Sequence, residues 1–410
     1  MLNKFFKSCL RQYSQLAIIL LTAVILFIVA NISLGIFFKI KDSHALKMAL
    51  MQLHYIEKHE RLFDVSFEDV YPNLNRNEIN DLLGETWNRS LRYEPFTQFK
   101  ESARKGTYVN VDESGFRHCK DQAPWPPNQE CFNVFLFGGS TTFNYGLPDN
   151  QTIATYLQEA LLKQSPGKNV CVYNFGRGYY YSSQERILFE KLLTEDHVPN
   201  LAIFIDGLNE IYNFEDRPYF SDDLEKFIDV KAPNKTILTL LYDRLPITRL
   251  ARSRQETANV PFEQQSLREI LAGRAALKDN DDTVGADALV VALLKKYTRN
   301  KLLIENAASM AGVIPVFVWQ PVPTYNYDLT NYRFVKSISA GLFVSGLTYP
   351  IMKQIEKQGT LGNNFLWCAD IQKDTQESLY VDQSHYNATM SKRLASYIVE
   401  QINERDLLVN

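Results

Sequence analysis

The stretch VFLFGGSTTFNYG, residues 134–146, decides the fold class of this 410-residue chain. Its first part, 134–137, is a short apolar run of the kind that forms a buried β-strand. Gly138 and Gly139 end that run, because a glycine pair interrupts regular structure. Ser140 follows at once, so the sequence predicts a hydroxyl group in the turn at the carboxyl end of a strand.

An alternation of strands and helices continues outward from this stretch. Strands are predicted at 134–137, 170–173, 201–205 and 313–318, and helices at 151–164, 183–194, 301–311 and 388–403. Strands that alternate with helices along a chain indicate a parallel sheet covered by helices on both of its faces. The sequence therefore predicts an α/β fold.

A long segment interrupts this alternation between the third and fourth predicted strands. It is far longer than a plain crossover connection needs to be. Residues 214–290 within it are rich in charge, and we interpret them as a helical insertion. The insertion either lies over or beside the functional site or is a solvated elaboration of the surface, and the sequence leaves both readings open.

The N-terminal part of the chain differs from the rest, because residues 16–38 carry no charged side chain over a length of 23 residues. A helix of roughly 20 apolar residues crosses a bilayer, and inside lipid only a helix satisfies its own backbone polar groups. We therefore predict a transmembrane helix at 16–38 after a short tail at 1–15. The alternative is a cleaved signal peptide, whose apolar region is usually shorter and ends in a small-residue cleavage site.

The predicted span divides the chain into a tail, a membrane-proximal region and a main domain. The charges that flank the span give little indication of which side of the membrane the main domain lies on. We expect a membrane-proximal region at 39–105, with helices at 45–60 and 76–83, and a main domain at 106–410. Lysine and arginine lie on both sides of the span, so the positive-inside rule barely chooses an orientation. A short N-terminal tail before a large C-terminal domain favours a signal anchor, with the main domain on the periplasmic or extracellular side.

Composition argues against two classes of site. The net charge of −3 offers no basic surplus for nucleic acid, so no such partner is expected. No C-x-x-C pair and no H-E-x-x-H motif occurs, so no metal site is predicted. Cys119 and Cys131 flank a proline-rich loop and either close a disulfide in an oxidising compartment or stay free. Cys171 is expected to be a buried thiol.

Candidate reactive residues follow the strand ends, where parallel sheets carry their sites. A serine hydroxyl needs a base within hydrogen-bond reach, and the chain has six histidines. Of these, only His385 lies in a predicted site loop with a carboxylate, Asp382, three residues earlier. Asp382 would fix the tautomer of the imidazole, and His385 would take the proton from Ser140. These three residues are the predicted catalytic triad.

Donors for an oxyanion are also present at the strand ends. The backbone N–H groups of Ser140 and Gly176 and the side-chain amide of Asn209 are the candidates, and Gly176 would allow close approach because it has no Cβ. Each feature alone is weak evidence, since a Gly-Gly-Ser turn or an Asp-x-x-His pair is common. Their order and their shared placement after successive strands make the set specific.

The set resembles the SGNH hydrolase superfamily, the GDSL-like esterases and lipases. Its conserved blocks are matched by VFLFGGSTTFNYG at 134–146, VYNFGRGYYYSSQE at 172–185, FIDGLNEIYN at 204–213 and VDQSHYNATMSKRLASYI at 381–398. The resemblance covers roughly residues 105–403 apart from the insertion. It implies a flavodoxin-like, three-layer α/β/α fold, acyl transfer through an acyl-serine, and neither metal nor organic cofactor. Two positions depart from the family pattern, Gly139 and Glu210, where the family has aspartate.

The sequence thus leads to two hypotheses of different classes. The first is a membrane-anchored serine esterase that removes or transfers acyl groups, such as acetyl, on small-molecule esters, cell-envelope glycans or lipids. The second is a catalytically silent module of the same fold that binds a glycan or a partner protein. An intact triad favours the enzyme, whereas substrate, oligomeric state and the choice between hydrolase and acyltransferase stay open.

Overall fold

The computed structural model describes residues 2–41, 56–57, 60–61, 64–165, 167–213, 216–228, 245–248, 283–335, 338 and 340–408. The chain divides into two compact units. One unit contains Met1–Leu53 and Lys226–Gln265, and the other contains His54–Glu225 and Ser266–Asn410. The predicted insertion at 214–290 and the predicted helix at 45–60 lie largely outside the described residues.

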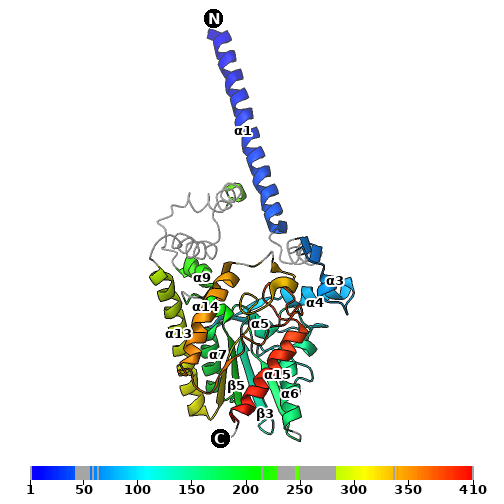
Figure 1. Ribbon diagram of the computed structural model, residues 1–410. Coiled ribbons are helices and arrows are strands. Elements are labelled where there is room, and N and C mark those ends of the chain that lie inside the picture. Colours follow the sequence, from blue (N-terminus) through cyan, green and yellow to red (C-terminus); the bar gives the residue numbers. More distant parts are fainter. Residues whose placement is uncertain are drawn as a thin grey trace. The chain divides into compact units, whose positions relative to one another are not determined.

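The first unit contains one long helix, α1 (Leu2–Lys41), drawn in blue in Figure 1. Its stretch Leu10–Ile40 is long and apolar enough to cross a membrane, by length and composition alone, and only 6% of its most apolar window is buried. The predicted span at 16–38 lies within this helix. Asn31, on the same helix, accepts a hydrogen bond from the backbone N–H of Ile247 at 3.2 Å.

The second unit is built around a five-stranded sheet (Figure 1). Its strands are β3 (Phe132–Gly138), β4 (Val170–Asn174), β5 (Leu201–Asp206), β6 (Ile314–Trp319) and β7 (Phe365–Trp367). They are hydrogen-bonded in the order β4-β3-β5-β6-β7, and every neighbouring pair is parallel. In chain order this is 2-1-3-4-5, the flavodoxin-like strand order. The predicted parallel α/β fold is therefore confirmed.

The central strands are apolar on both faces, which is why they occupy the middle of the sheet. All six residues of β5 are buried. Because side chains alternate along a strand, Phe137, Phe204 and Phe317 face one core, and Leu136 and Ile203 face the other. The ring of Phe204 stacks on both of the other two phenylalanines, at 4.8 and 5.3 Å.

Helices cover both faces and give three layers. The helices of the unit, with α9 at its edge, are α3 (Phe67–Val70), α4 (Arg76–Trp87), α5 (Ser140–Phe143), α6 (Ile153–Gln164), α7 (Ser182–Thr194), α8 (Leu208–Tyr212), α9 (Ser221–Ile228), α13 (Thr283–Ala311), α14 (Ala340–Lys357) and α15 (Ala388–Glu404), with short 3-10 turns at Asp149–Gln151 and Leu329–Asn331. Helices α6 and α15 pack on the face of Leu136, and α7, α13 and α14 pack on the face of Phe137.

The predicted helices at 76–83, 151–164, 183–194 and 388–403 are all present, and the one at 301–311 is the end of α13. Two elements of the layers were not predicted. Strand β7 has three residues, too few to show a period, and α14 carries Pro350 in its interior, which argues against a helix.

The disulfide of the described residues joins Cys131 to Cys171, with their Cα atoms 6.0 Å apart. The predicted partner Cys119 is a buried free thiol. The reason lies in the sheet, because the register of β3 and β4 sets Asn133 opposite Cys171 and so brings Cys131 alongside β4. The predictions of a Cys119–Cys131 bond, of a free Cys131 and of a buried thiol at Cys171 were all wrong.

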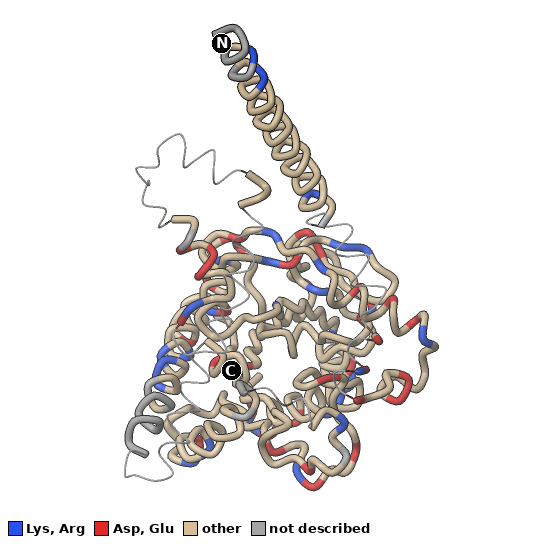
Figure 2. Tube along the Cα trace, turned by 90° about the horizontal axis from the view of Figure 1, so that it is seen from above, with Lys and Arg blue, Asp and Glu red and all other residues tan. Residues whose placement is uncertain are grey.

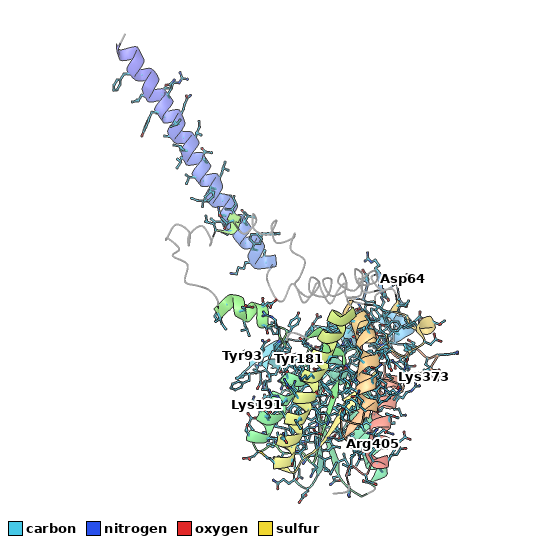
Figure 3. The ribbon with its side chains drawn as sticks, turned by 60° about the vertical axis from the view of Figure 1, so that its left-hand side comes forward. Asp64, Tyr93, Tyr181, Lys191, Lys373 and Arg405 are labelled. Carbon is cyan, nitrogen blue, oxygen red and sulfur yellow. A yellow bond between two sulfur atoms is a disulfide. The ribbon has the colours of Figure 1, made fainter. Side chains whose placement is uncertain are left out.

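A small antiparallel hairpin, β1 (Leu91–Glu94) and β2 (Gln98–Glu101), precedes the main sheet and was not predicted. It lies against α7, because Lys191 of that helix forms an ion pair with Glu94 and Gln184 donates to the carbonyl of Thr97 at 2.8 Å. Tyr93 and Lys191 lie on this side of the unit in Figure 3. The hairpin, which belongs to the predicted membrane-proximal region at 39–105, is thus packed on α7.

Charged residues do not single out one surface of the second unit. Along the described trace, acidic and basic residues are interspersed (Figure 2). Functional residues must therefore be found from local geometry.

Candidate active site

The predicted nucleophile lies at the tight connection between β3 and α5. Ser140 is the first residue of α5, and Gly139 precedes it as the N-cap. A Cβ on Gly139 would lie 2.2 Å from Nδ2 of Asn209. Any side chain at 139, including the aspartate of the family pattern, would displace that amide. The residue before Ser140 thus lies against Asn209, and a shared role of these two side chains stays a prediction.

The predicted acid and base form a close pair. Asp382 lies with Oδ2 2.7 Å and Oδ1 2.9 Å from Nδ1 of His385. Its Oδ1 also accepts from the backbone N–H groups of Ser384 and His385, both at 2.9 Å. Burial acts to raise the pKa of Asp382, but the charge of His385 and these hydrogen bonds outweigh it and hold the pKa below its ordinary value. Asp382 is therefore a carboxylate that keeps the proton on Nδ1.

This pairing leaves the other ring nitrogen as a base. His385 is 7% exposed, and its Nε2 is buried without a hydrogen-bond partner among the described residues. A neutral imidazole with its proton on Nδ1 has a lone pair on Nε2, which is the form a general base requires. No hydrogen bond joins Nε2 to Ser140 here, and such bonds often form only when substrate binds.

Tyr145 connects the turn of the candidate nucleophile Ser140 to the candidate base His385. Its backbone N–H donates to the carbonyl of Ser140 at 3.2 Å, and its ring stacks on His385 with centroids 5.0 Å apart. A second link runs through Gln320 after β6, which accepts from Thr141 at 2.6 Å and from the Tyr386 hydroxyl at 3.3 Å. Segments far apart in sequence thus meet at the carboxyl edge of the sheet.

The predicted oxyanion donors differ in how they are engaged. Asn209, on α8, donates from Nδ2 to the carbonyl of Tyr180 at 2.7 Å, which leaves the second N–H of its amide for another acceptor. The N–H of Gly176 donates to Oδ1 of Asn174 at 2.9 Å. A Cβ on Gly176 would lie 2.6 Å from the backbone N of Phe143, so this glycine lets the loop pack tightly on α5. Its role as a donor stays a prediction, with its N–H already engaged.

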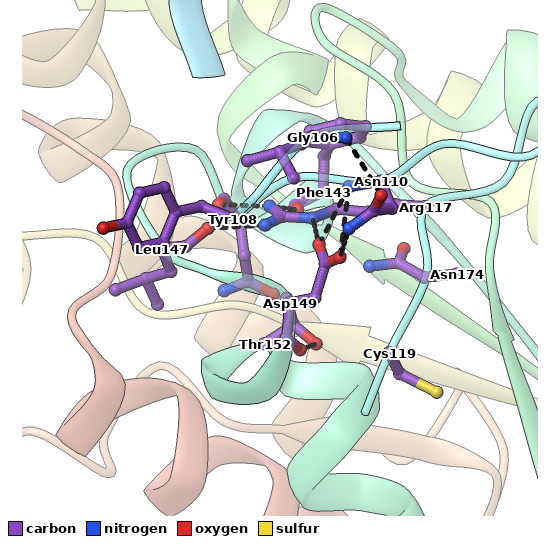
Figure 4. Close-up of polar contacts among 12 residues, drawn as sticks. Gly106, Tyr108, Asn110, Arg117, Cys119, Phe143, Leu147, Asp149, Thr152 and Asn174 are labelled. Carbon is purple, nitrogen blue, oxygen red and sulfur yellow. Dashed lines mark hydrogen bonds and ion pairs between the residues drawn. The ribbon is translucent and has the colours of Figure 1, made fainter. Parts of the chain in front are cut away.

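An arginine that sequence reasoning missed holds the nucleophile turn (Figure 4). Arg117 is fully buried and donates from Nη1 to the carbonyls of Phe143 and Asn144, both at 2.6 Å. Its Nε donates to Oδ1 of Asp149 at 3.1 Å. Asp149 also accepts from the side chain of Asn110 at 2.8 Å. These hydrogen bonds satisfy backbone carbonyls at the end of α5. The sequence around Arg117 contains no local pattern that predicts them.

The loop that carries Asn209 is held in a similar way by its neighbour. Glu210, where the family has aspartate, is buried and accepts from both the backbone N–H and the hydroxyl of Ser182, at 2.6 and 2.9 Å. Asn300 of α13 donates to the same hydroxyl at 3.0 Å. The departure at Glu210 thus keeps a carboxylate that fastens α8 to the start of α7.

Several solved structures are similar to this chain. A putative arylesterase from Agrobacterium tumefaciens matches with 13% identity and a TM-score of 0.35, covering 66% of this chain and 98% of its own. A catalytic mutant of an acetylxylan esterase from Geobacillus stearothermophilus matches with 12% identity and a TM-score of 0.35, over 66% and 93%. A carbohydrate acetylesterase from Sinorhizobium meliloti matches with 12% identity and a TM-score of 0.34, over 66% and 98%.

No family model matches the sequence, and no curated protein matches it. At identities this low, the chemistry of the chain has to be argued from its own side chains. Among the described residues, no group of histidine, cysteine and acidic side chains has the arrangement of a metal site.

Proposed function

We propose that this chain is a serine esterase of the SGNH type, with Ser140 as nucleophile, His385 as base and Asp382 as the residue that orients the base. The observation that carries the proposal is the Asp382–His385 pair, which fixes the proton on Nδ1 and leaves a buried Nε2 with no hydrogen-bond partner in the part of the chain that the structure describes. A buried nitrogen without a hydrogen-bond partner lowers the stability of the fold. The same nitrogen can accept the proton of a hydroxyl group beside it, which is what a general base does.

The reaction follows from these positions. Ser140 Oγ attacks the carbonyl carbon of an ester as its proton passes to Nε2 of His385. The negative oxygen that forms is stabilised by the N–H of Ser140, which lies in the first turn of α5 without an intrahelical partner, and by the second N–H of Asn209. His385 then gives the proton to the leaving alcohol. Water or an acceptor hydroxyl releases the acyl group from Ser140 by the same steps in reverse order.

The setting of this chemistry is the outer side of a membrane. Helix α1 would serve as an anchor, and the Cys131–Cys171 disulfide favours an oxidising compartment for the second unit. An acyl ester on a cell-envelope glycan or lipid is the substrate class that fits an enzyme held there. Because deacylation and acyl transfer share the acyl-serine, the proposal covers both outcomes.

The test compares the full-length protein in detergent with its Ser140→Ala variant. Hydrolysis of p-nitrophenyl acetate and labelling by a serine-reactive fluorophosphonate should both be lost, with a fall in kcat of about 10³-fold or more. Ser309→Ala, on the exposed face of α13, is the matched control and should keep both. Full activity in the Ser140 variant would sink the assignment, and folded wild-type protein without labelling would favour the silent binding module.

A further inference from the structure

The segment before the main sheet brings two large side chains to the candidate base. Trp87 ends α4, and its ring meets His385 edge-on, with centroids 5.5 Å apart and planes at 75°. The same indole contacts Tyr145 at 4.8 Å. Trp87 therefore borders the imidazole from a part of the chain in which the sequence showed no chemistry.

Tyr145 borders the imidazole from another direction. Its ring lies nearly parallel to that of His385, at 17° and a centroid distance of 5.0 Å. The hydrogen bond from Nδ1 to Asp382 fixes one atom of the ring but leaves it free to tilt about that bond. A flat contact from Tyr145 and an edge contact from Trp87 restrict this tilt, and so they set where Nε2 points.

Arg89 in turn holds Tyr145. Its Nη2 donates to the phenol oxygen of Tyr145 and, at 3.1 Å, to Oε1 of Glu101 on β2. The guanidinium carbon lies 4.2 Å from the ring centroid of Tyr145 and 4.1 Å from that of Phe143, which ends α5. Arg89 thus contacts the nucleophile helix and the residue that stacks on the base at the same time.

Burying the Arg89–Glu101 ion pair lowers the stability of the fold, which argues against a role in core packing alone. The side chains of Arg89 and Glu101 are 7% and 0% exposed. Among the residues that the structure describes, Nε and Nη1 of Arg89 and Oε2 of Glu101 have no hydrogen-bond partner. A buried charge that leaves donors unpaired weakens a fold relative to a packed apolar side chain. A guanidinium is nevertheless suited to this place, because its plane stacks on rings while its edge donates.

We propose that Trp87, Arg89 and Tyr145 are positioning residues for His385, so that the segment at 87–101 is part of the active site. The inference rests on the proposed esterase function. Arg89 fixes Tyr145 against α5, Tyr145 and Trp87 hold the imidazole plane, and the imidazole plane directs Nε2. Each of the three acts through the orientation of His385, so their loss should change the rate of the chemical step and leave substrate binding nearly unchanged.

The experiment uses the full chain in detergent and p-nitrophenyl acetate. Tyr145→Leu and Arg89→Met should each lower kcat about 10–100-fold, the size expected when a reacting group is displaced by about 1 Å, with KM changed less than about threefold. Tyr145→Phe keeps the stacked ring and should recover most of the kcat that Tyr145→Leu loses. Tyr93→Leu, which changes an exposed tyrosine on β1 within the segment at 87–101, is the control and should match wild type.

Trp87→Phe and Trp87→Ala provide a second pair in case Tyr145→Leu does not fold, and the ring-retaining Trp87→Phe should keep the higher kcat. Wild-type kcat in Arg89→Met and Tyr145→Leu, or a rise in KM alone, would overturn the inference. So would equal losses in Tyr145→Phe and Tyr145→Leu. Ser140→Ala, measured in the same assay, distinguishes failure of the esterase proposal from failure of the positioning role. Activity retained there removes the esterase proposal itself, whereas activity lost there but kept in the Arg89 and Tyr145 variants removes only the positioning role.

Discussion

Glu185 and Asp206 are two buried carboxyl groups near the loop that carries Asn209, and both are less than 5% exposed. Burial, aided by the charges of Asp206 and Glu210, raises the pKa of Glu185 well above its ordinary value. Burial and Glu210 likewise raise the pKa of Asp206. A carboxyl whose pKa rises on folding contributes its full stability below the unfolded pKa, near 4.5 for Glu185, and this contribution is lost as the pH rises through the folded pKa.

Glu185→Gln removes a group that must ionise in the interior at high pH. The midpoint of thermal unfolding of this variant, minus that of wild type, should therefore increase between about pH 5 and about pH 9, because the variant lacks the loss of stability that ionisation of Glu185 causes in wild type. Circular dichroism of the full chain in detergent measures both midpoints. Glu195→Gln, at the exposed end of α7, should show no such trend. A difference that does not change with pH would contradict the raised pKa.

At the scale of elements, the short helix α5 depends on residues outside itself. Four residues make too few internal hydrogen bonds to be stable alone. Arg117 provides additional hydrogen bonds, because it donates to the carbonyls of Phe143 and Asn144 and forms an ion pair with Asp149. The nucleophile turn is thus fixed by a loop that precedes the main sheet in the chain.

Arg117→Met should break this arrangement and leave Asp149, whose side chain is 15% exposed, without its charge partner. Loss of one member of a buried ion pair costs about 3–5 kcal/mol, so the free energy of unfolding in urea should fall by about that amount. Arg92→Met, an exposed arginine on β1, is the matched control and should change it by less than about 0.5 kcal/mol. An Arg117 variant as stable as its control would show that α5 does not need the guanidinium.

At the scale of the whole molecule, the disulfide and the apolar helix both bear on the compartment in which the second unit is located. The Cys131–Cys171 bond joins the residue before β3 to β4. Cys119 stays a free thiol, and burial raises its pKa to about 12. A disulfide between strands persists in oxidising compartments and is rare in the cytosol. It therefore supports the proposed location of the second unit on the outer side of a membrane, which the charges beside α1 left nearly undecided.

Thiol labelling of the protein, taken from cell membranes without reductant and then denatured, tests that orientation. Under denaturing conditions, maleimide should modify Cys131 and Cys171 only after reduction, whereas Cys119 should react without it. Cys131→Ser is the control, because it frees Cys171, which should then react without reduction. If both cysteines of the pair react in unreduced wild type, the second unit lies in a reducing compartment and the proposed outer location is wrong.

The sequence alone determined the features that depend on neighbours in the chain. Apolar runs ended by glycine predicted β3, β4 and β5, and an apolar run ended by proline predicted β6. Their alternation with helices predicted a parallel sheet. Asp382 and His385 could be paired because they are three residues apart, so local geometry brings them together. Ser140 could be set beside Asn209 because parallel strands end at a common edge.

Tertiary structure alone decided the contacts that no local period encodes. The partner of Cys131 was set by the register of β3 on β4, and β7 was too short to announce itself. The contacts of Arg89 with Tyr145, and of Tyr145 and Trp87 with His385, join residues tens to hundreds of positions apart. Side chains that meet only after the sheet has formed leave no pattern in the sequence, because packing in three dimensions selects them.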